Sequence, residues 1–464
     1  MKIEEILVIS DIAEKIKQLK IRVNTAPDVA AIEKEYLPAQ HKIFDQTERP
    51  DKLIKNDDGS TRTEKVARIA IALQKIIVKR AAMFTFGREV KIESETEDQN
   101  SKDVLSAVKK IWSDTKLSFK NRRIARYVFA YTECAEIWYP IEGTEVNSKY
   151  GFETKFRLRC QLASPALGDT LYPLFDEYGD LVAFSRELTR QEGDKKVKYF
   201  ETYTATNIIK WQSADSGWIE LSNVANALKK IPVIYAKQDE VEWVDVQVLI
   251  DRLEKLLSNF GDTNDYHASP KIFITGEIKG FARKGEAGGI IEGVLGSKAE
   301  YLAWAQAPEA VKLEIETLLK LIYSLTQTPD VSFDSVKGLG NISGVALKLL
   351  FLDAHLKVED KKEIFGEYLQ RRVNLLKAFV GMMNTQLAEA ANLLDIEPEI
   401  TPYMIDDETA EIEMLSTANG AKPVISQKTS IRLAGLVDDV DAELIQIQAE
   451  EAASNVSNVF GTAQ

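Results

Sequence analysis

The feature that most constrains the fold is a long, continuous helical pattern over residues 343–385. Ser343 suits the N-cap position, because a serine oxygen can accept a hydrogen bond from a free N–H group of the first helical turn. At about 1.5 Å per residue, about 40 helical residues extend about 60 Å. A helix of this length exceeds what a small globular core requires and favours a scaffold or an assembly. Gly366 and Gly381 lie inside the pattern and have low helix propensity, so the axis need not be straight.

Two further helices are predicted at 242–264 and 308–325. Both carry apolar residues at helical spacing, and Pro308 occupies a first-turn position that suits proline. The apolar stripes at 244–257 and 311–322 are typical of a core or of a contact between subunits, and not of a ligand site.

These two helices bracket a small insert, residues 265–307. Its first strand-like segment, 271–280, could pair within the chain as an ordinary hairpin or exchange with a strand of a neighbouring copy, and the sequence leaves both possibilities open. After the second helix, residues 326–342 contain several helix-breaking residues. They are predicted to form a loop that leads into the long helix.

A strand-rich module is predicted over residues 135–235, where β-branched and aromatic residues recur between Gly, Asp and Asn turns. Residues 176–180 read as a hairpin turn inside it. Helices are predicted before this module, at 64–83, 101–114 and 119–133. The first of them is expected to end near Gly87, where glycine permits a reversal. The sequence therefore predicts an α+β fold that is mainly helical.

Charge is distributed unevenly along the 464 residues, a length that suggests two to four structural modules. The formal net charge is −13, and residues 386–464 contribute −12 of it, from 15 acidic and 3 basic side chains. A protein that reads DNA sequence normally carries a large basic surface that replaces counterions along the phosphates. Net charge therefore argues against tight, sequence-specific DNA binding.

The sequence contains none of the common catalytic or metal-binding motifs. No GxxxxGK[ST] phosphate loop is present, and the three histidines and two cysteines show no ligand spacing. We therefore expect no enzyme activity, no cofactor and no metal. Acidic residues stand near the N-terminus where a secretory signal requires basic ones, and no stretch is long enough to span a bilayer, so we expect no membrane association.

Two motifs around the 326–342 loop resemble the signature of siphophage portal proteins. Thr328-Pro329-Asp330 begins the loop, and Asn341-Ile342-Ser343-Gly344-Val345-Ala346-Leu347 opens the long helix. The order of the predicted elements resembles that family along nearly the whole chain. Residues 332–337, between the two motifs, depart from the family pattern.

The resemblance implies a portal-type architecture of wing, stem, clip and crown. Its expected parts are a wing at 1–241, stem helices at 242–264 and 308–325, a clip at 265–307, a tunnel loop at 326–342, a long wing helix at 343–385, and an acidic helical crown and tail at 386–464.

The resemblance also implies a function. The chain would form a homo-oligomeric ring, expected to be a 12-mer, at one capsid vertex of a virion assembled in the host cytoplasm. Double-stranded DNA would pass through the ring without sequence specificity during packaging and ejection. Expected protein partners are terminase, a head–tail adaptor, the major capsid protein and scaffolding protein. One alternative is another oligomeric phage head–tail connector or scaffold ring, and a second is a nucleic-acid enzyme whose site matches no known motif.

Two groups of residues are candidates for these contacts. The DNA-facing candidates of the tunnel loop are Thr328, Pro329, Asp330, Lys337, Gly338, Gly340, Asn341 and Ser343. Among them the polar side chains would meet phosphates and the glycines would give mobility, whereas a plain linker is the simpler interpretation. The clip candidates for partner docking are Lys271, Lys279, Arg283 and Lys284, whose basic character could instead serve solubility alone.

Overall fold

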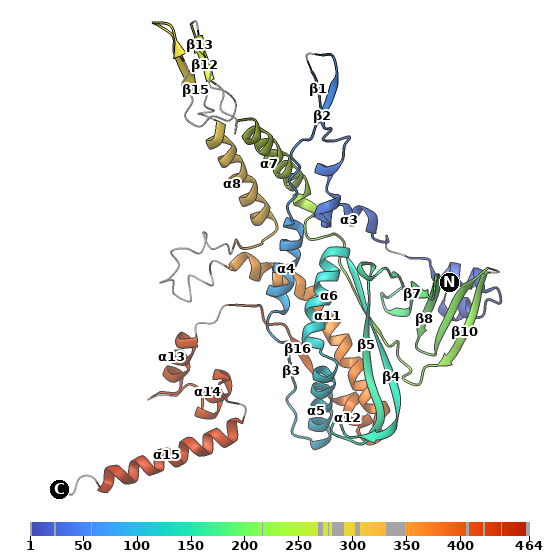
Figure 1. The fold of residues 1–464 in the computed structure, drawn as a ribbon. Coiled ribbons are helices and arrows are strands. Elements are labelled where there is room, and N and C mark those ends of the chain that lie inside the picture. The colour runs from blue at the N-terminus through green and yellow to red at the C-terminus, as the bar shows by residue number, and fades with distance from the viewer. Residues whose placement is uncertain are drawn as a thin grey trace. The chain divides into compact units, whose positions relative to one another are not determined.

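The computed structural model describes residues 2–460 with the exception of 23–24, 57, 216, 268–271, 277, 281–291, 302–306, 331–348, 350, 405–407, 421–422 and 438. The chain forms two compact units. Unit 1 comprises Met1–Asp330 and Asp353–Tyr403, and unit 2 comprises Val331–Leu352 and Met404–Gln464. Helices and strands both contribute to unit 1, as Figure 1 shows, and the predicted α+β class is confirmed.

An antiparallel sheet of five strands, in the order β10-β9-β8-β7-β6, forms one part of unit 1. Its strands are β6 (Thr170–Phe175), β7 (Leu181–Glu192), β8 (Lys195–Thr204), β9 (Asn207–Ala214) and β10 (Gly217–Ala225). The predicted turn at 176–180 joins β6 to β7. Asp176 donates its N–H to the carbonyl of Asp180 over 2.9 Å, and Gly179 has a φ of 85°, which glycine adopts without strain.

Two short helices at the N-terminus, α1 (Ile3–Leu7) and α2 (Ile12–Leu19), pack on this sheet. Asp11 caps α2 by accepting a 3.0 Å hydrogen bond from the N–H of Ala13. The apolar faces of the two helices and the sheet share a core formed by Ile6, Ile16, Leu19, Phe200, Ile209 and Trp211.

A second antiparallel sheet has the order β11-β4-β5. Its strands are β4 (Glu133–Asn147), β5 (Thr154–Ala163) and β11 (Val233–Lys237). The two sheets meet in a common core formed by Ala135, Ile137, Ala163, Leu171, Phe184, Tyr203, Val233 and Tyr235. The sheets are therefore joined by packed side chains, and not only by the chain connections.

The long helix of unit 1, α11 (Leu352–Met383), contacts α4 (Leu73–Phe86), α5 (Gln99–Asp114) and α6 (Leu117–Tyr131). Helix α3 (Val29–Tyr36) packs on α4 and α6, and 3-10 turns lie at Pro38–Gln40, Lys42–Phe44, Pro165–Leu167 and Val244–Val246. Phe365, Leu369, Leu376 and Phe379 recur on α11 at steps of three to four or seven residues, and all are fully buried. This spacing places them on one face, so α11 is a core helix of the unit.

The long helix agrees only in part with its prediction over 343–385. It has 32 residues, corresponding to about 48 Å, and it ends at Met383. The expected N-terminal residues 343–348 lie outside the described residues. The helix continues through both internal glycines. A Cβ at Gly381 would lie 3.2 Å from the Cα of Ala388, so glycine lets the chain fold back closely after the helix ends.

The boundary predicted at residue 386 does not coincide with the division between the two compact units. The turn Thr385–Leu387, helix α12 (Ala388–Leu393) and strand β16 (Glu397–Glu399) belong to unit 1, and unit 2 resumes at Met404. Strand β16 pairs with β3 (Lys91–Glu93) in an antiparallel ladder. Apolar side chains bury this segment against unit 1, namely Leu387, Ala391, Leu394, Ile396 and Ile400. A boundary drawn from charge alone overlooked these side chains.

The helix predicted over 64–83 is wrong in its first half. Residues 65–72 are extended, and α4 begins only at Leu73. The end of α4 before Gly87 agrees with the prediction, but the reason differs. Gly87 has the φ of a right-handed helix, −68°, and a Cβ there would lie 2.8 Å from the ring of Tyr403. Close packing, and not a reversal of the backbone, therefore requires glycine.

Two helices of unit 1, α7 (Gln247–His267) and α8 (Ala307–Leu325), bracket a set of short strands. These strands are β12 (Ile272–Thr275), β13 (Ile278–Gly280), β14 (Glu292–Gly293) and β15 (Lys298–Tyr301), paired as β12–β15 and β13–β14. A separate hairpin of β1 (Lys52–Lys55) and β2 (Thr61–Glu64) projects beside α7 in Figure 1.

Unit 2 is helical in its described residues after Met404. Its helices are α13 (Glu408–Ala418), α14 (Gln427–Ala434) and α15 (Val440–Phe460). Ser426 caps α14 by accepting the N–H of Thr429, and Gly435, with a φ of 64°, ends it. None of the described helices of the chain combines the length and apolar character needed to cross a membrane.

A buried ion pair connects α11 to the three-stranded sheet. Arg372 makes two hydrogen bonds to Glu136 of β4, at 2.7 and 2.8 Å, and a third to Asn121 of α6 at 2.6 Å. Arg372 and Glu136 have no exposed side-chain surface. Burial alone would lower the pKa of Arg372, but Glu136 and Tyr368 raise it above the ordinary value, so the guanidinium stays charged.

Replacing Arg372 with Met should lower the free energy of unfolding by about 3–5 kcal/mol, because Glu136 would keep an unpaired buried charge. The neighbouring change Arg371→Met is the matched control. Arg371 pairs with Glu367 on the exposed side of the same helix, and loss of that pair should cost no more than about 0.5 kcal/mol. Urea denaturation followed by circular dichroism measures both. Equal effects would contradict the importance of the buried pair.

Candidate functional site

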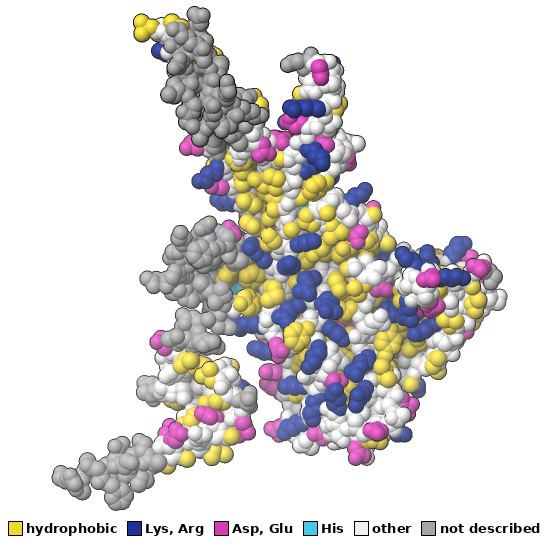
Figure 2. Space-filling view, in the orientation of Figure 1, with side chains coloured by type: hydrophobic (Ala, Val, Ile, Leu, Met, Phe, Trp, Pro, Cys, Tyr) yellow, Lys and Arg dark blue, Asp and Glu magenta, His cyan; other side chains and the backbone are white. Residues whose placement is uncertain are grey.

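The helices α7 and α8 pack against each other through buried apolar side chains and leave others uncovered. The buried side chains include Ile250, Leu253, Leu318 and Ile322. An ion pair of 2.6 Å between Arg252 and Glu314 also joins the two helices. Large apolar side chains on the other faces are exposed in a single copy, as Figure 2 shows over these helices: Val244, Val248, Leu313, Leu321 and Leu325.

The exposed leucines of α8 form one row. Leu313, Leu321 and Leu325 differ by multiples of four positions, which places them on one ridge of the helix surface. Leu313 is 65% exposed and Leu325 is 57% exposed. Apolar surface of this kind, when contiguous, usually marks a contact with another protein.

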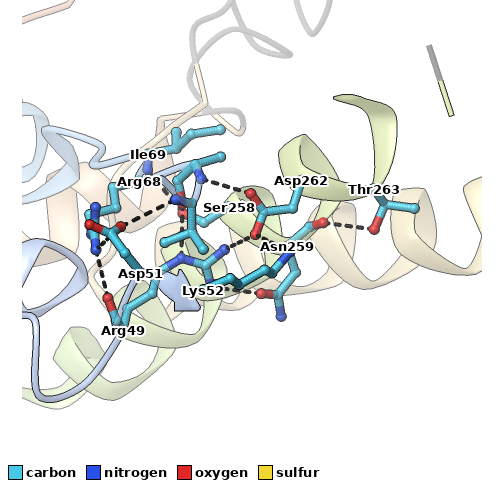
Figure 3. Close-up of polar contacts among 11 residues, drawn as sticks. Arg49, Asp51, Lys52, Arg68, Ile69, Ser258, Asn259, Asp262 and Thr263 are labelled. Carbon is cyan, nitrogen blue, oxygen red and sulfur yellow. Dashed lines mark hydrogen bonds and ion pairs between the residues drawn. The ribbon is translucent and has the colours of Figure 1, made fainter. Parts of the chain in front are cut away.

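The position of α7 is fixed by an extended segment, residues 65–72, that runs along it. Figure 3 shows side chains of α7 accepting hydrogen bonds from the backbone of this segment. The N–H of Ala67 donates to Asp262 over 2.7 Å, and the N–H of Ile69 donates to Ser258 over 2.9 Å. One turn earlier on the helix, Glu254 accepts the N–H of Ile71 over 2.8 Å.

The hydrogen bonds between the extended segment and α7 form a ladder. The repeat lengths of the two elements explain it. Four residues of a helix rise about 6 Å, and two residues of an extended chain span about 6.6 Å. Side chains four positions apart on α7 can therefore receive every second N–H group of the segment. Gly261 allows the close approach, because a Cβ there would lie 3.2 Å from the Cβ of Ala67. The N–H groups of Ala67, Ile69 and Ile71 are thus satisfied without a helix, which explains the failed prediction.

Arginine side chains on either side of the ladder add further hydrogen bonds to it. Arg49 donates to the carbonyl of Ala67 over 2.8 Å and to Asn259 and Asp262 of α7, each over 2.7 Å. Arg68 donates to Asp51 over 2.8 Å (Figure 3). The base of the β1–β2 hairpin, the extended segment and α7 are therefore held together by one connected set of polar contacts.

The chain leaves α8 through residues that are held inside unit 1. Gln327 has a left-handed φ of 49°, which ends the helix. The N–H of Thr328 donates to the carbonyl of Tyr323 over 2.9 Å, and the hydroxyls of Thr326 and Thr328 lie 3.0 Å apart. Both threonines are buried. The first residues of the predicted tunnel loop therefore form an ordered base.

Two cationic side chains anchor this loop base to other helices. Arg80 of α4 donates to the carbonyl of Pro329 over 2.6 Å and lies over the ring of Tyr323. Lys357 of α11 donates to the carbonyl of Thr326 over 2.8 Å. Three elements, α4, α8 and α11, therefore meet where the loop begins.

Lys357 also belongs to a buried charge cluster. Glu242 lies 2.6 Å from Lys357 and 2.5 Å from Lys361. Burial alone would raise the pKa of Glu242, but the two lysines hold it below the ordinary value. Burial lowers the pKa of Lys357 below its ordinary value despite the opposing effect of Glu242. The carboxylate thus holds in place the lysine that fixes the loop base.

The structure describes only the first three of the predicted DNA-facing residues. Thr328 is buried in this single copy, with 4% of its surface exposed, and its contact with DNA stays a prediction. Pro329 and Asp330 are half-buried. The remaining loop candidates lie outside the described residues: Lys337, Gly338, Gly340, Asn341 and Ser343.

Most of the predicted clip candidates also lie outside the described residues. Lys279 lies in β13, and Lys271, Arg283 and Lys284 fall outside the described residues. In this single copy β12 pairs with β15 of its own chain, which is the intrachain alternative of the two left open. No group of three or more His, Cys, Asp or Glu side chains suited to a metal ion occurs among the described residues.

Sequence reasoning missed the residues that anchor the loop. Arg80, Glu242 and Lys357 are far apart in the sequence, and no motif connects them. The available signal was weak: Lys357 stands between Ala354 and Val358, which are buried positions of the same helix. A charged residue among apolar positions could have suggested a buried partner, but not which one.

Comparisons with known proteins give a family and distant structural likenesses. Residues 21–457 match the phage portal protein family of the SPP1 Gp6-like type. One similar solved structure is the neck of a native gene transfer agent particle computed with C12 symmetry, with a TM-score of 0.41, 10% identity, and coverage of 90% of this chain and 96% of that chain. Another is the virion of a native gene transfer agent particle, with a TM-score of 0.40, 10% identity, and coverage of 94% and 99%. No curated protein matches the sequence.

Changing Ser258 to Ala should open the ladder along α7, because the N–H of Ile69 would lose its acceptor. Loss of this part-buried hydrogen bond should cost about 0.5–1.5 kcal/mol, which corresponds to amide exchange about 2- to 13-fold faster at this position. Hydrogen–deuterium exchange of peptides covering 65–72 measures the effect. Thr263→Ala is the control, since this hydroxyl donates only to the carbonyl of Asn259 within α7. Unchanged exchange in Ser258→Ala would contradict a stabilising role of the ladder.

The charge cluster at the loop base predicts a loss of stability in acid. The pKa of Glu242 is below its ordinary value of 4.5 in the folded protein, so its contribution is fully present above pH 4.5 and is lost as the pH falls through the folded pKa. The difference in unfolding free energy between the wild type and Glu242→Gln should therefore be largest at neutral pH and shrink in acid. Denaturant titrations at several pH values test this, with Glu314→Gln at the exposed pair as control. A difference independent of pH would rule out the pairing described.

Proposed function

The chain belongs to the phage portal protein family of the SPP1 Gp6-like type, and we propose that it is the subunit of a closed ring at one capsid vertex. DNA passes through this ring during packaging and again during ejection. The match to the family over residues 21–457 is the observation that carries the proposal. The ring is part of the virion and assembles in the host cytoplasm.

The uncovered apolar row on α8 supports the closed ring. Each copy buries one side of the α7–α8 pair internally and leaves Leu313 and Leu321 exposed. A head-to-tail contact between copies would cover such a row on every subunit, and it closes when the rotation between copies completes a circle. The ring we propose has twelve copies.

The charge distribution supports transport of DNA without sequence recognition. Residues 386–464 carry a net charge of −12, which disfavours tight binding of phosphates where this segment meets DNA. In our proposal, the loop residues beyond Asp330, with Lys337 and Asn341, face the DNA. The base of the loop, held by Arg80 and Lys357, gives that part a fixed attachment.

The clip and the wing supply the protein contacts of the proposed ring. Terminase and later a head–tail adaptor dock on the clip, at the basic residues Lys271, Lys279, Arg283 and Lys284. The major capsid protein and scaffolding protein contact the body of the ring. We assign no catalytic role to the chain, because the family is one of structural proteins and the sequence contains no catalytic motif.

Electron microscopy of the purified full chain tests this proposal. The wild type should form closed rings with a central hole wide enough for a DNA duplex. The double variant Leu313→Lys with Leu321→Lys should give folded subunits that no longer form rings, because lysine charges would be buried in the contact. Tyr178→Lys, at a hairpin position that is 84% exposed, is the control and should form rings normally.

The possible outcomes separate the alternatives. A wild type that remains a compact monomer would overturn the proposal. Rings whose hole is too narrow for a duplex would favour another head–tail connector or scaffold ring. Rings that persist in the double variant would show that the α8 row is not the contact between copies.

A further inference from the structure

A strongly basic surface lies on α5 and α6, away from the site described above. Residues 99–131 contain eight basic and two acidic side chains, although the whole chain has a net charge of −13. The exposed basic residues of this surface are Lys102, Lys109, Lys110, Lys116 and Arg123. Figure 2 shows Lys and Arg side chains gathered over the part of unit 1 that contains these helices.

The acidic residues of the two helices do not neutralise this surface. Asp114 pairs instead with Lys149 and with Arg159, the latter at 3.7 Å. Asp103 accepts a 2.8 Å hydrogen bond from the side chain of Gln99. Within the described ranges of the chain, no ion pair involves any of the five exposed basic residues. Exposed like charges repel one another, so an anionic partner would relieve a real electrostatic cost.

The surface is hollowed on both sides of Lys109. One hollow of about 420 Å³ is lined by Lys102, Leu105, Ser106, Lys109, Lys110 and Ser113. The other, of about 450 Å³, lies between this helix and β3 and has a mixed lining. Its basic residues are Lys91, Lys109 and Lys116, its acidic residues are Glu89 and Glu93 at the β3 side, and Ser113 and Ser118 complete its polar part. Lysine and serine side chains are among the groups that contact phosphate oxygens in protein–DNA complexes.

The spacing of the lysines suits a regularly charged polymer. Lys102 and Lys109 are seven positions apart on α5, so they share one face and are separated by about 10.5 Å along the axis. Three phosphate steps on one strand of duplex DNA cover about 10 Å of its axis. A rigid helix can therefore present cations at intervals that match every third phosphate.

The composition of the surface favours DNA over an acidic protein segment. Protein interfaces have apolar cores in which lysine is depleted. Here lysine dominates the exposed positions, and Phe119 is the large apolar side chain of α5 and α6 that is well exposed. A hydrated, phosphate-rich partner fits such a surface better than a protein that must exclude water.

We propose that the surface of α5 and α6 binds the phosphate backbone of duplex DNA without sequence preference. The proposal places this binding outside the channel, in addition to passage through it. In Figure 1 α5 lies at the end of unit 1 opposite to α7 and α8, whose exposed leucine row is the proposed contact between copies. The inference rests on the proposed function only in that DNA is the polyanion a portal ring meets. The surface would hold DNA that lies beside the ring. Tight binding at that place does not slow the DNA that moves through the channel.

Filter binding of the full-length protein to covalently closed circular DNA tests the proposal. A closed circle has no end to thread through a ring, so retention reports binding outside a channel. The triple variant Lys109→Gln, Lys110→Gln and Lys116→Gln removes three positive charges. The matched control, Lys195→Gln, Lys196→Gln and Lys198→Gln, removes three exposed charges from the five-stranded sheet.

The salt dependence gives the expected size of the effect. Each neutralised phosphate contributes about 0.9 to the slope of log affinity against log salt. Losing three contacts should lower the slope by about 2.7, so between about 50 and about 200 mM salt the wild type should lose about 40-fold more affinity than the triple variant. The control variant should keep the slope of the wild type.

Three results would overturn the inference: no retention of the circle at low salt, an unchanged slope in the triple variant, or an equal loss in the control variant. Displacement of a polyglutamate probe in preference to DNA would instead assign the surface to an acidic protein segment. Electron microscopy of the same samples keeps the two proposals apart, because rings can form normally while the circle fails to bind.

Discussion

The fold around α7 depends on how every second N–H group between Ala67 and Ile71 finds an acceptor. An extended segment normally needs a neighbouring strand, and here the side chains of Glu254, Ser258 and Asp262 take that role. The arrangement works because one helical turn and two extended residues have nearly equal length. The same hydrogen bonds also hold α7 in position, since each accepting side chain of the helix is bound to a particular N–H group of the segment. The direction in which α7 leaves the body therefore follows from a local match of two repeats.

Much of the fold could be predicted from the sequence, because periodic patterns are local. The five strands β6 to β10 lie inside the strand-rich module predicted at 135–235, and the helices α5, α6 and α8 lie close to their expected ranges. The failures occurred where a long-range contact overrides a local pattern. Residues 65–72 contain helix-compatible spacing but are recruited by α7, and residues 386–403 look like an acidic tail but bury Leu394 and Ile396. No pattern within either segment reveals its distant partner.

The candidate site shows the same limit in its chemistry. The Thr328-Pro329-Asp330 motif was found in the sequence, but the burial of Thr328 could not be predicted because it depends on contacts with Tyr323 and Thr326. The net charge of the chain likewise did not reveal where a local binding surface lies. An acidic chain can carry a local surface such as α5 and α6, where the basic residues outnumber the acidic ones by eight to two. Totals over a chain describe its average field, whereas binding depends on the field over a few helical turns.

The anchoring of the loop base has a mechanical consequence. Lys357, which holds the carbonyl of Thr326, is on the same rigid helix as Arg372, which grips Glu136 in the sheet. A force that pulls on the chain at Asp330 is therefore transmitted along α11 from Lys357 to Arg372, fifteen positions later, and from there to the core of the sheet. The helix therefore transmits tension without lengthening. Force at one of its two anchor points is resisted by the buried charge pair at the other.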